Sequence, residues 1–158
     1  MRSFIVVVAL LALAGCSTLT LAPSDFAWPV MSELTADKAG TVSEDRYHLS
    51  FNIKPLMQEE LQDSVNVAGK SVSVIRDRQG FYFVTGPKFK NVYVFQHAAE
   101  GLALVSSFNV HPTGLANPEF NQRPPHIQLL NGRDKTVLLT RSGVFTPPTP
   151  APAPGGGK

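Results

Sequence analysis

The sequence has very little cysteine, with Cys16 as the only one among 158 residues. A single cysteine has no partner within the chain for a disulfide bond, so an apolar core must stabilise the fold. Zinc motifs that contain a pair of cysteines are excluded for the same reason. The lone thiol therefore needs an explanation of its own.

The chain lacks a large excess of charge of either sign. The chain has 14 lysines and arginines against 12 acidic residues, which gives a formal net charge of +2. Nucleic-acid-binding domains generally carry a strongly basic face. This composition gives no reason to expect a nucleic-acid partner.

Long apolar runs are lacking as well. The N-terminal run covers residues 4–13, whereas a helix needs about 20 apolar residues to cross a bilayer. The run follows the positively charged Arg2 and ends in small residues, a pattern typical of a secretory signal peptide. Cleavage after residue 15 would remove Arg2 and leave a nearly balanced chain.

The end of this run carries a more specific pattern: Leu13, Ala14, Gly15 and Cys16. These four residues resemble the lipobox of bacterial lipoproteins at every position. The resemblance implies that a diacylglyceryl group is attached to the Cys16 sulfur, that the chain is cut before Cys16, and that the new amino group is acylated. The bilayer would then be a partner of the chain through Cys16, since two or more acyl chains give stable anchoring.

The residue after the cysteine indicates in which membrane the lipoprotein is anchored. In this family an aspartate at that position tends to retain the protein in the inner membrane of Gram-negative cells, and Ser17 stands there instead. The resemblance thus favours the outer membrane, with the folded body facing the periplasm. The alternative is an ordinary secreted protein whose cysteine lies near the cleavage site by chance.

Four segments are expected. Residues 1–15 are the signal peptide, residues 16–25 a lipidated tether, residues 26–145 a single β-rich domain, and residues 146–158 a disordered tail rich in Pro and Gly. Near the start of the domain, Phe26 and Trp28 are expected to seal one end of the core. The alternative is contact with the bilayer surface.

Residues 47–53 alternate between apolar and polar side chains, which predicts a half-buried strand. A short helix is predicted from Pro55 to about Asp63, with Leu56, Met57 and Leu61 facing inward. Residues 36–45 are polar and contain a glycine, which predicts a loop.

Three hairpins are predicted after residue 70. They comprise Ser71–Arg76 with Phe81–Thr85, residues 91–97 with 102–108, and residues 126–130 with 136–140. Each pair flanks a turn that contains glycine, and the strands are rich in Val, Phe, Tyr and Leu. The pattern predicts a mainly β fold: a small antiparallel β-sandwich or barrel-like domain of hairpins with one short helix.

Residues 109–125 form a long stretch with four prolines, which predicts a stiff loop. Loops of this length are uncommon and often functional. Its candidate contact residues for a partner or ligand are His111, Phe120, Arg123 and His126. The alternative is a rigid crossover between two sheets.

The sequence contains no strong catalytic or metal-binding motif. The four histidines lack the spacing of a zinc site, and no nucleophile elbow, phosphate loop or dinucleotide fingerprint is present. We therefore expect no metal or cofactor and no catalytic residues.

The expected role is non-catalytic binding or scaffolding in a periplasmic or outer-membrane assembly, with an envelope protein or the cell wall as partner. The alternative is a small-ligand-binding or hydrolytic envelope protein with a cleft near His111 and His126.

Overall fold

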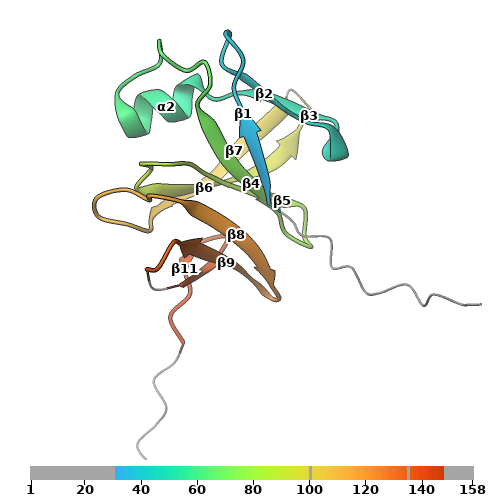
Figure 1. Ribbon diagram of the computed structural model, residues 1–158. Coiled ribbons are helices and arrows are strands. Elements are labelled where there is room, and N and C mark those ends of the chain that lie inside the picture. Colours follow the sequence, from blue (N-terminus) through green and yellow to red (C-terminus); the bar gives the residue numbers. More distant parts are fainter. Residues whose placement is uncertain (1–30, 100, 135, 148–158) are drawn as a thin grey trace, which may run out of the picture.

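The computed structural model of the chain describes residues 31–99, 101–134 and 136–147 (Figure 1). The expected signal peptide, the lipid attachment site Cys16, the tether and most of the tail lie outside the described residues, as do Phe26 and Trp28.

Most of the described residues belong to short β-strands. In chain order these are β1 (Ser32–Thr35), β2 (Thr41–Glu44), β3 (Leu49–Asn52), β4 (Ser71–Arg76), β5 (Phe81–Thr85), β6 (Asn91–Ala98), β7 (Gly101–Asn109), β8 (Pro118–Arg123), β9 (His126–Asn131), β10 (Val137–Thr140) and β11 (Gly143–Val144). A 3-10 helix (Asp45–Tyr47) lies between β2 and β3, and helix α2 (Lys54–Leu61) follows β3.

The strands form three antiparallel sheets. The largest has the order β1-β4-β5-β6-β7, the second β11-β10-β9-β8, and the smallest pairs β2 with β3. Figure 1 shows the large sheet in the middle of the molecule, with β2, β3 and α2 above it and the four-stranded sheet below it. The sheets stay open, so the molecule is a layered sandwich.

The inner strands β4 and β5 of the five-stranded sheet are buried on both faces. In β4, Val72 and Val74 pack toward β2, β3 and α2, whereas Ile75 packs toward the four-stranded sheet. In β5, Val84 and Phe83 divide in the same way. Because successive side chains in a strand point to opposite faces, a sheet covered on both sides requires nearly continuous apolar strands. The sequences of β4 and β5 meet that requirement.

Two apolar cores result. The upper core is sealed by Ile53, Leu56 and Met57 from the region of α2. The lower core contains Phe120, Ile127 and Leu139 from the four-stranded sheet. Burial of a large apolar side chain contributes about 1.5–3 kcal/mol, so these cores stabilise the fold without a disulfide bond in the described residues.

The predicted mainly β antiparallel fold with one short helix is confirmed. All three predicted hairpins are present, with the strand ends of the first at the predicted residues. The strand predicted over residues 47–53 is shorter, because Tyr47 belongs to the 3-10 helix. Its alternation holds nevertheless, with Leu49 buried and Ser50 and Asn52 exposed.

Two predicted loops were wrong in part. Residues 36–45 contain β2, which pairs with β3 and buries Val42 against the upper core. Residues 109–125 contain β8, which pairs with β9 from Pro118 opposite Asn131 to Arg123 opposite His126. The irregular connection between β7 and β8 is therefore only residues 110–117.

The prolines explain why β8 resembles a loop in the sequence. Pro118 is its first residue, and the Pro124–Pro125 pair, joined by a cis peptide bond, makes the turn into β9. Proline is tolerated at the first residue of a strand and on edge strands, where no ladder donor is needed. β8 is such an edge strand.

Within the described residues, no helix has the length and apolar character that crossing a membrane requires.

Candidate functional site

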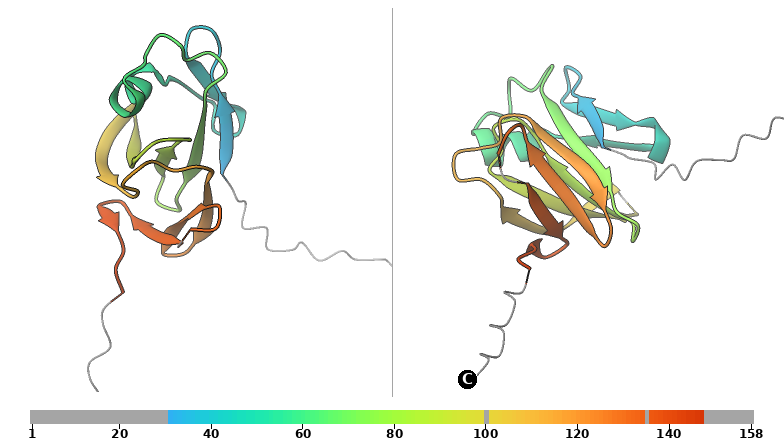
Figure 2. Two further views of the ribbon diagram at one scale, coloured as in Figure 1. Left: turned by 60° about the vertical axis from the view of Figure 1, so that its left-hand side comes forward. Right: turned by 60° about the horizontal axis from the view of Figure 1, so that its bottom comes forward.

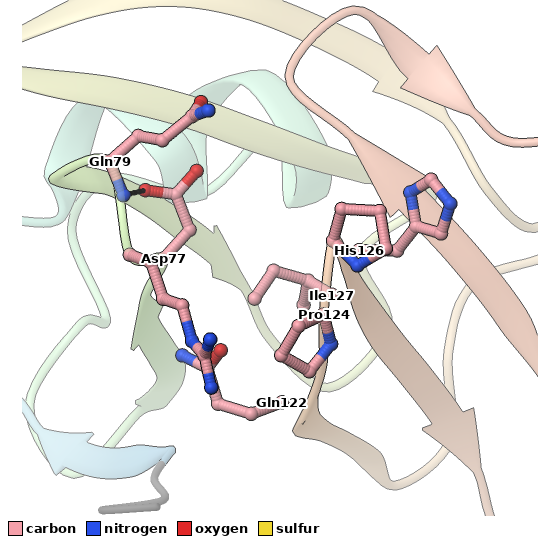
Figure 3. A pocket seen from close by; sticks show the side chains of 8 residues that line it. Asp77, Gln79, Gln122, Pro124, His126 and Ile127 are labelled. Carbon is pink, nitrogen blue, oxygen red and sulfur yellow. Dashed lines mark hydrogen bonds between the residues drawn. The ribbon is translucent and has the colours of Figure 1, made fainter.

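A cavity of about 410 Å³ lies between the β4–β5 turn and the β8–β9 turn. Residues 77–79 line one side, and Gln122 with residues 124–127 line the other. Figure 3 shows Asp77 and Gln79 across the hollow from Pro124, His126 and Ile127. Its size is within the range of small-molecule sites.

The β4–β5 turn holds its side of the cavity through Asp77. The Asp77 carboxylate oxygen Oδ1 accepts hydrogen bonds from the backbone N–H groups of Gln79 and Phe81, each at 2.8 Å. Aspartate favours turns because its side chain can bond to nearby backbone in this way. The fixed turn leaves the side chains of Arg78 and Gln79 exposed at the rim of the cavity.

Gln122 links the two strands, β4 and β8, that lead into these turns. Its side-chain amide Nε2 donates a hydrogen bond of 2.6 Å to the backbone carbonyl of Arg76 at the end of β4. The contact links β8 to β4, two strands from different sheets. This hydrogen bond therefore connects the two sides of the cavity.

His126 forms part of the opposite wall. Its ring stacks on Phe145, with the ring centroids 4.2 Å apart and the planes inclined by 25°. Phe145 follows β11, and its backbone N–H donates to the carbonyl of Leu138 at 2.7 Å. His126 is opposite Arg123 in the β8–β9 register, and Arg123 is exposed.

His111 lies elsewhere. Its Nε2 is 3.8 Å from Asp134 Oδ2, and its Nδ1 is 3.5 Å from the Thr113 hydroxyl. Asp134 also accepts a hydrogen bond from Asn131, the last residue of β9. His126 is the first residue of β9, so about 17 Å of strand separates the two ends. The structure does not bring His111 and His126 together in one cleft.

Asn131 holds the connection between β7 and β8 in place. This buried side chain accepts hydrogen bonds through Oδ1 from the backbone N–H groups of Ala116 and Asn117, at 2.8 and 3.0 Å. Asn131 follows the first strand of the third predicted hairpin. Its position just before Gly132 signals a turn, and nothing in the sequence marks the contact with residues 116 and 117.

Phe120, one of the four predicted contact residues, is buried in the structure. Its side chain is 6% exposed and packs in the lower core, and its backbone N–H contacts the sulfur of Met31 at 3.1 Å. Of the four candidate residues, His126 lines the cavity, Arg123 is exposed beside it, His111 lies at the far end of β9, and Phe120 is structural.

A buried carboxylate lies above the central sheet. Glu44 is paired with Arg46 at 2.8 Å, and Arg46 also contacts the Ser32 hydroxyl. The hydrogen bond from the Arg46 side chain lowers the pKa of Glu44 below its ordinary value, against the opposing effect of burial. The Arg46 guanidinium lies over the Tyr47 ring at 5.7 Å. This cluster joins β1 to the smallest sheet and has a structural role.

The cavity lining is suited to hydrogen bonding and charge pairing. It offers a guanidinium, a carboxylate, an imidazole and two amides, and no hydroxyl, thiol or amine from a side chain lines it. The described residues contain no group of three or more histidine, cysteine or acidic side chains that could hold a metal ion.

The chain matches no known protein family, no curated protein and no solved structure.

Proposed function

We propose that this chain is a lipid-anchored protein of the bacterial cell envelope whose β-rich body binds another envelope component. The observation that carries the proposal is the sequence from Leu13 to Cys16, placed at the end of a ten-residue apolar run. The absence of any other cysteine supports it. In this proposal the Cys16 thiolate is the nucleophile that accepts the lipid, because a thiolate reacts far more readily than a hydroxyl.

The proposed role of the body is binding or scaffolding. The described residues support this role through two features: a cavity lined by groups that can form hydrogen bonds and charge pairs, and apolar side chains exposed on strands β7 and β11. The proposed partner is an envelope protein or the cell wall.

The proposed location is the outer membrane, with the body facing the periplasm. It depends on Ser17, which occupies the position where aspartate signals retention in the inner membrane.

Labelling with palmitate in a Gram-negative host, followed by separation of the two membranes, tests the anchor and the location together. The unsubstituted chain should be labelled and recovered with the outer membrane. Cys16→Ala should lose the label and leave the membrane fraction. Ser17→Asp should keep the label and move to the inner membrane, whereas Ser17→Ala, the matched control, should not move.

Continued labelling of Cys16→Ala would overturn the anchor. An unchanged distribution of Ser17→Asp would overturn the location alone.

The cavity favours a second candidate function, the binding of a polar small molecule or a cell-wall fragment. Arg78 could pair with an anionic group, and Gln79 and His126 could donate or accept hydrogen bonds. Of the two histidines of the predicted cleft, His126 lines this cavity and His111 does not.

Cosedimentation with purified peptidoglycan sacculi tests this candidate. Arg78→Ala combined with His126→Ala should release the chain from the sacculi. Arg133→Ala combined with His111→Ala, at the opposite end of β9, is the matched control and should still sediment. Equal sedimentation of both double variants would contradict a role for the cavity.

A further inference from the structure

Two opposite charges are neighbours on one wall of the cavity. Asp77 and Arg78 are consecutive residues of the β4–β5 turn, and both line the cavity. Among the described residues of the lining, the imidazole of His126 is the only other group that can carry a charge. Figure 2 (right) shows the green β4–β5 turn and the orange β8–β9 turn side by side at one end of the molecule. The cavity therefore presents one carboxylate and one guanidinium to whatever enters it.

Both charged groups are open to a ligand. Asp77 Oδ1 accepts the two backbone hydrogen bonds that hold the turn, whereas Asp77 Oδ2 has no partner among the described residues. The Arg78 guanidinium forms no hydrogen bond or ion pair with any described residue, and its side chain is exposed. A carboxylate oxygen accepts from an ammonium, and a guanidinium donates to an anion. The wall thus offers one site for each sign of charge.

The opposite wall is apolar. Pro124, Pro125 and Ile127 line it, and Figure 3 shows Pro124 and Ile127 across the hollow from Asp77. Proline has no backbone N–H to donate. This wall therefore suits an aliphatic group better than a polar one.

The same lining is poorly matched to a ligand with fewer charges. A neutral sugar over this wall would displace water from Asp77 and Arg78 and pair with neither, which is unfavourable for both groups. A ligand with one charge would leave one of the two side chains without a partner. A small ligand that carries both an ammonium and a carboxylate satisfies both.

We propose that the cavity binds an amino-acid group, with its ammonium at Asp77, its carboxylate at Arg78 and its aliphatic chain against the apolar wall. A guanidinium pairs with a carboxylate through two parallel hydrogen bonds. The proposal rests on the second candidate function, because it names the ligand class of the same cavity. A free amino acid carries such a group, and so does a cell-wall peptide whose diaminopimelate side chain ends in one.

Isothermal titration calorimetry with the full chain, purified in detergent, tests the ligand class. Norleucine has an ammonium, a carboxylate and an aliphatic chain. N-Acetylnorleucine lacks the ammonium, and norleucine amide lacks the carboxylate. Each derivative should bind at least about tenfold more weakly than norleucine, because hydrogen bonds to charged groups contribute more than neutral ones.

A pair of peptides distinguishes the two sources of the group. Acetyl-Ala-Glu-diaminopimelate-Ala carries an amino-acid group at the end of its third side chain, whereas acetyl-Ala-Glu-Lys-Ala carries an ammonium alone. If the first peptide binds at least about tenfold more tightly than both the second peptide and norleucine, the ligand is the cell-wall peptide. If norleucine binds as tightly as the first peptide, the ligand is a free amino acid.

Two conservative substitutions test the residues, with the tighter of norleucine and the diaminopimelate peptide as the probe. Asp77→Asn keeps a carbonyl oxygen for the turn and removes the charge, and Arg78→Gln removes the guanidinium. Each should weaken binding at least about tenfold. Asp37→Asn is the matched control for the first, since Asp37 Oδ1 also accepts two backbone hydrogen bonds in a turn and Asp37 does not line the cavity. Arg123→Gln, at an exposed arginine outside the lining, is the control for the second.

Three results would overturn the proposal. They are the failure of both norleucine and the diaminopimelate peptide to bind, equal binding of norleucine and either derivative, and wild-type affinity in Asp77→Asn and Arg78→Gln. If cosedimentation with sacculi still depends on the cavity in any of these cases, the second candidate function stands and only the ligand class is wrong.

Discussion

Glu60 on α2 accepts a hydrogen bond of 2.9 Å from the hydroxyl of Tyr93 on β6. The same carboxylate accepts hydrogen bonds from the backbone N–H groups of Lys90 and Asn91, at 2.8 and 3.1 Å. One side chain thus fixes the end of α2 to the beginning of β6. Tyr93 is 1% exposed, so its hydroxyl donates to Glu60 rather than to solvent.

Glu60→Ala should lower the free energy of unfolding by about 1–3 kcal/mol, because it leaves a buried hydroxyl and two backbone donors without their acceptor. Urea unfolding measures the change. Glu59→Ala, at the exposed neighbouring residue, is the control and should change stability by no more than about 0.5 kcal/mol. Equal effects of the two substitutions would contradict the role assigned to Glu60.

The same pair predicts a loss of stability at alkaline pH. Burial, followed by the hydrogen bond to Glu60, raises the pKa of Tyr93 well above its ordinary value of 10.0. Above pH 10 the unfolded chain loses this proton while the folded chain keeps it, so the free energy of unfolding falls as pH rises. Below pH 10 the contribution is fully present.

Urea unfolding at pH 9 and pH 11 should show a smaller loss of stability in Tyr93→Phe than in the wild type. Identical losses in the two proteins would show that Tyr93 does not titrate in this way.

Phe120→Ala tests the burial of Phe120 in the lower core. Removal of a buried phenylalanine ring from a core costs about 3–5 kcal/mol, and Phe120 packs in the lower core. Arg123→Ala changes an exposed residue of the same strand and should cost less than about 0.5 kcal/mol. A stability loss for Phe120→Ala no larger than that of Arg123→Ala would contradict the burial of Phe120 in the lower core.

Gly114 holds the connection between β7 and β8 against the loop before β6. Its φ is +101°, and a Cβ atom there would lie 2.5 Å from the backbone oxygen of Lys88. The next residue, Leu115, exchanges backbone hydrogen bonds with Lys88 and Phe89. A side chain at residue 114 would therefore push the two segments apart.

Gly114→Ala should cost more than about 2 kcal/mol, because strain at positive φ alone costs roughly 1–2 kcal/mol. Gly132→Ala is the matched control. Its φ of +56° is also positive, but a Cβ there would meet open space, so strain alone should remain. Thermal unfolding of the two variants gives the comparison, and equal losses would refute the predicted clash.

The hairpins could be predicted from the sequence because their signals are local. Asp77 followed by Gly80 marks the β4–β5 turn, and the apolar strands on either side define its length. Strand β8 was missed because Pro118, Pro124 and Pro125 obscure the alternation around Phe120. Prolines exclude a central strand, and only the fold shows that β8 lies at an edge.

The cavity could not be predicted in the same way. Gln122 bonds to the carbonyl of Arg76, and His126 stacks on Phe145. Both contacts join residues far apart in the sequence, and their formation depends on how the two larger sheets pack. The sequence indicates His111 and His126 together, because the two bracket the long proline-rich stretch, and it does not show which of them lines a cavity.

The most direct test of the proposed anchor is mass spectrometry of the N-terminal peptide from protein isolated out of a bacterial envelope. The account predicts a peptide that begins at Cys16 and carries the added mass of a diacylglyceryl thioether and an amide-linked acyl chain. A free thiol on Cys16, or a mature chain that begins at any other residue, would contradict it.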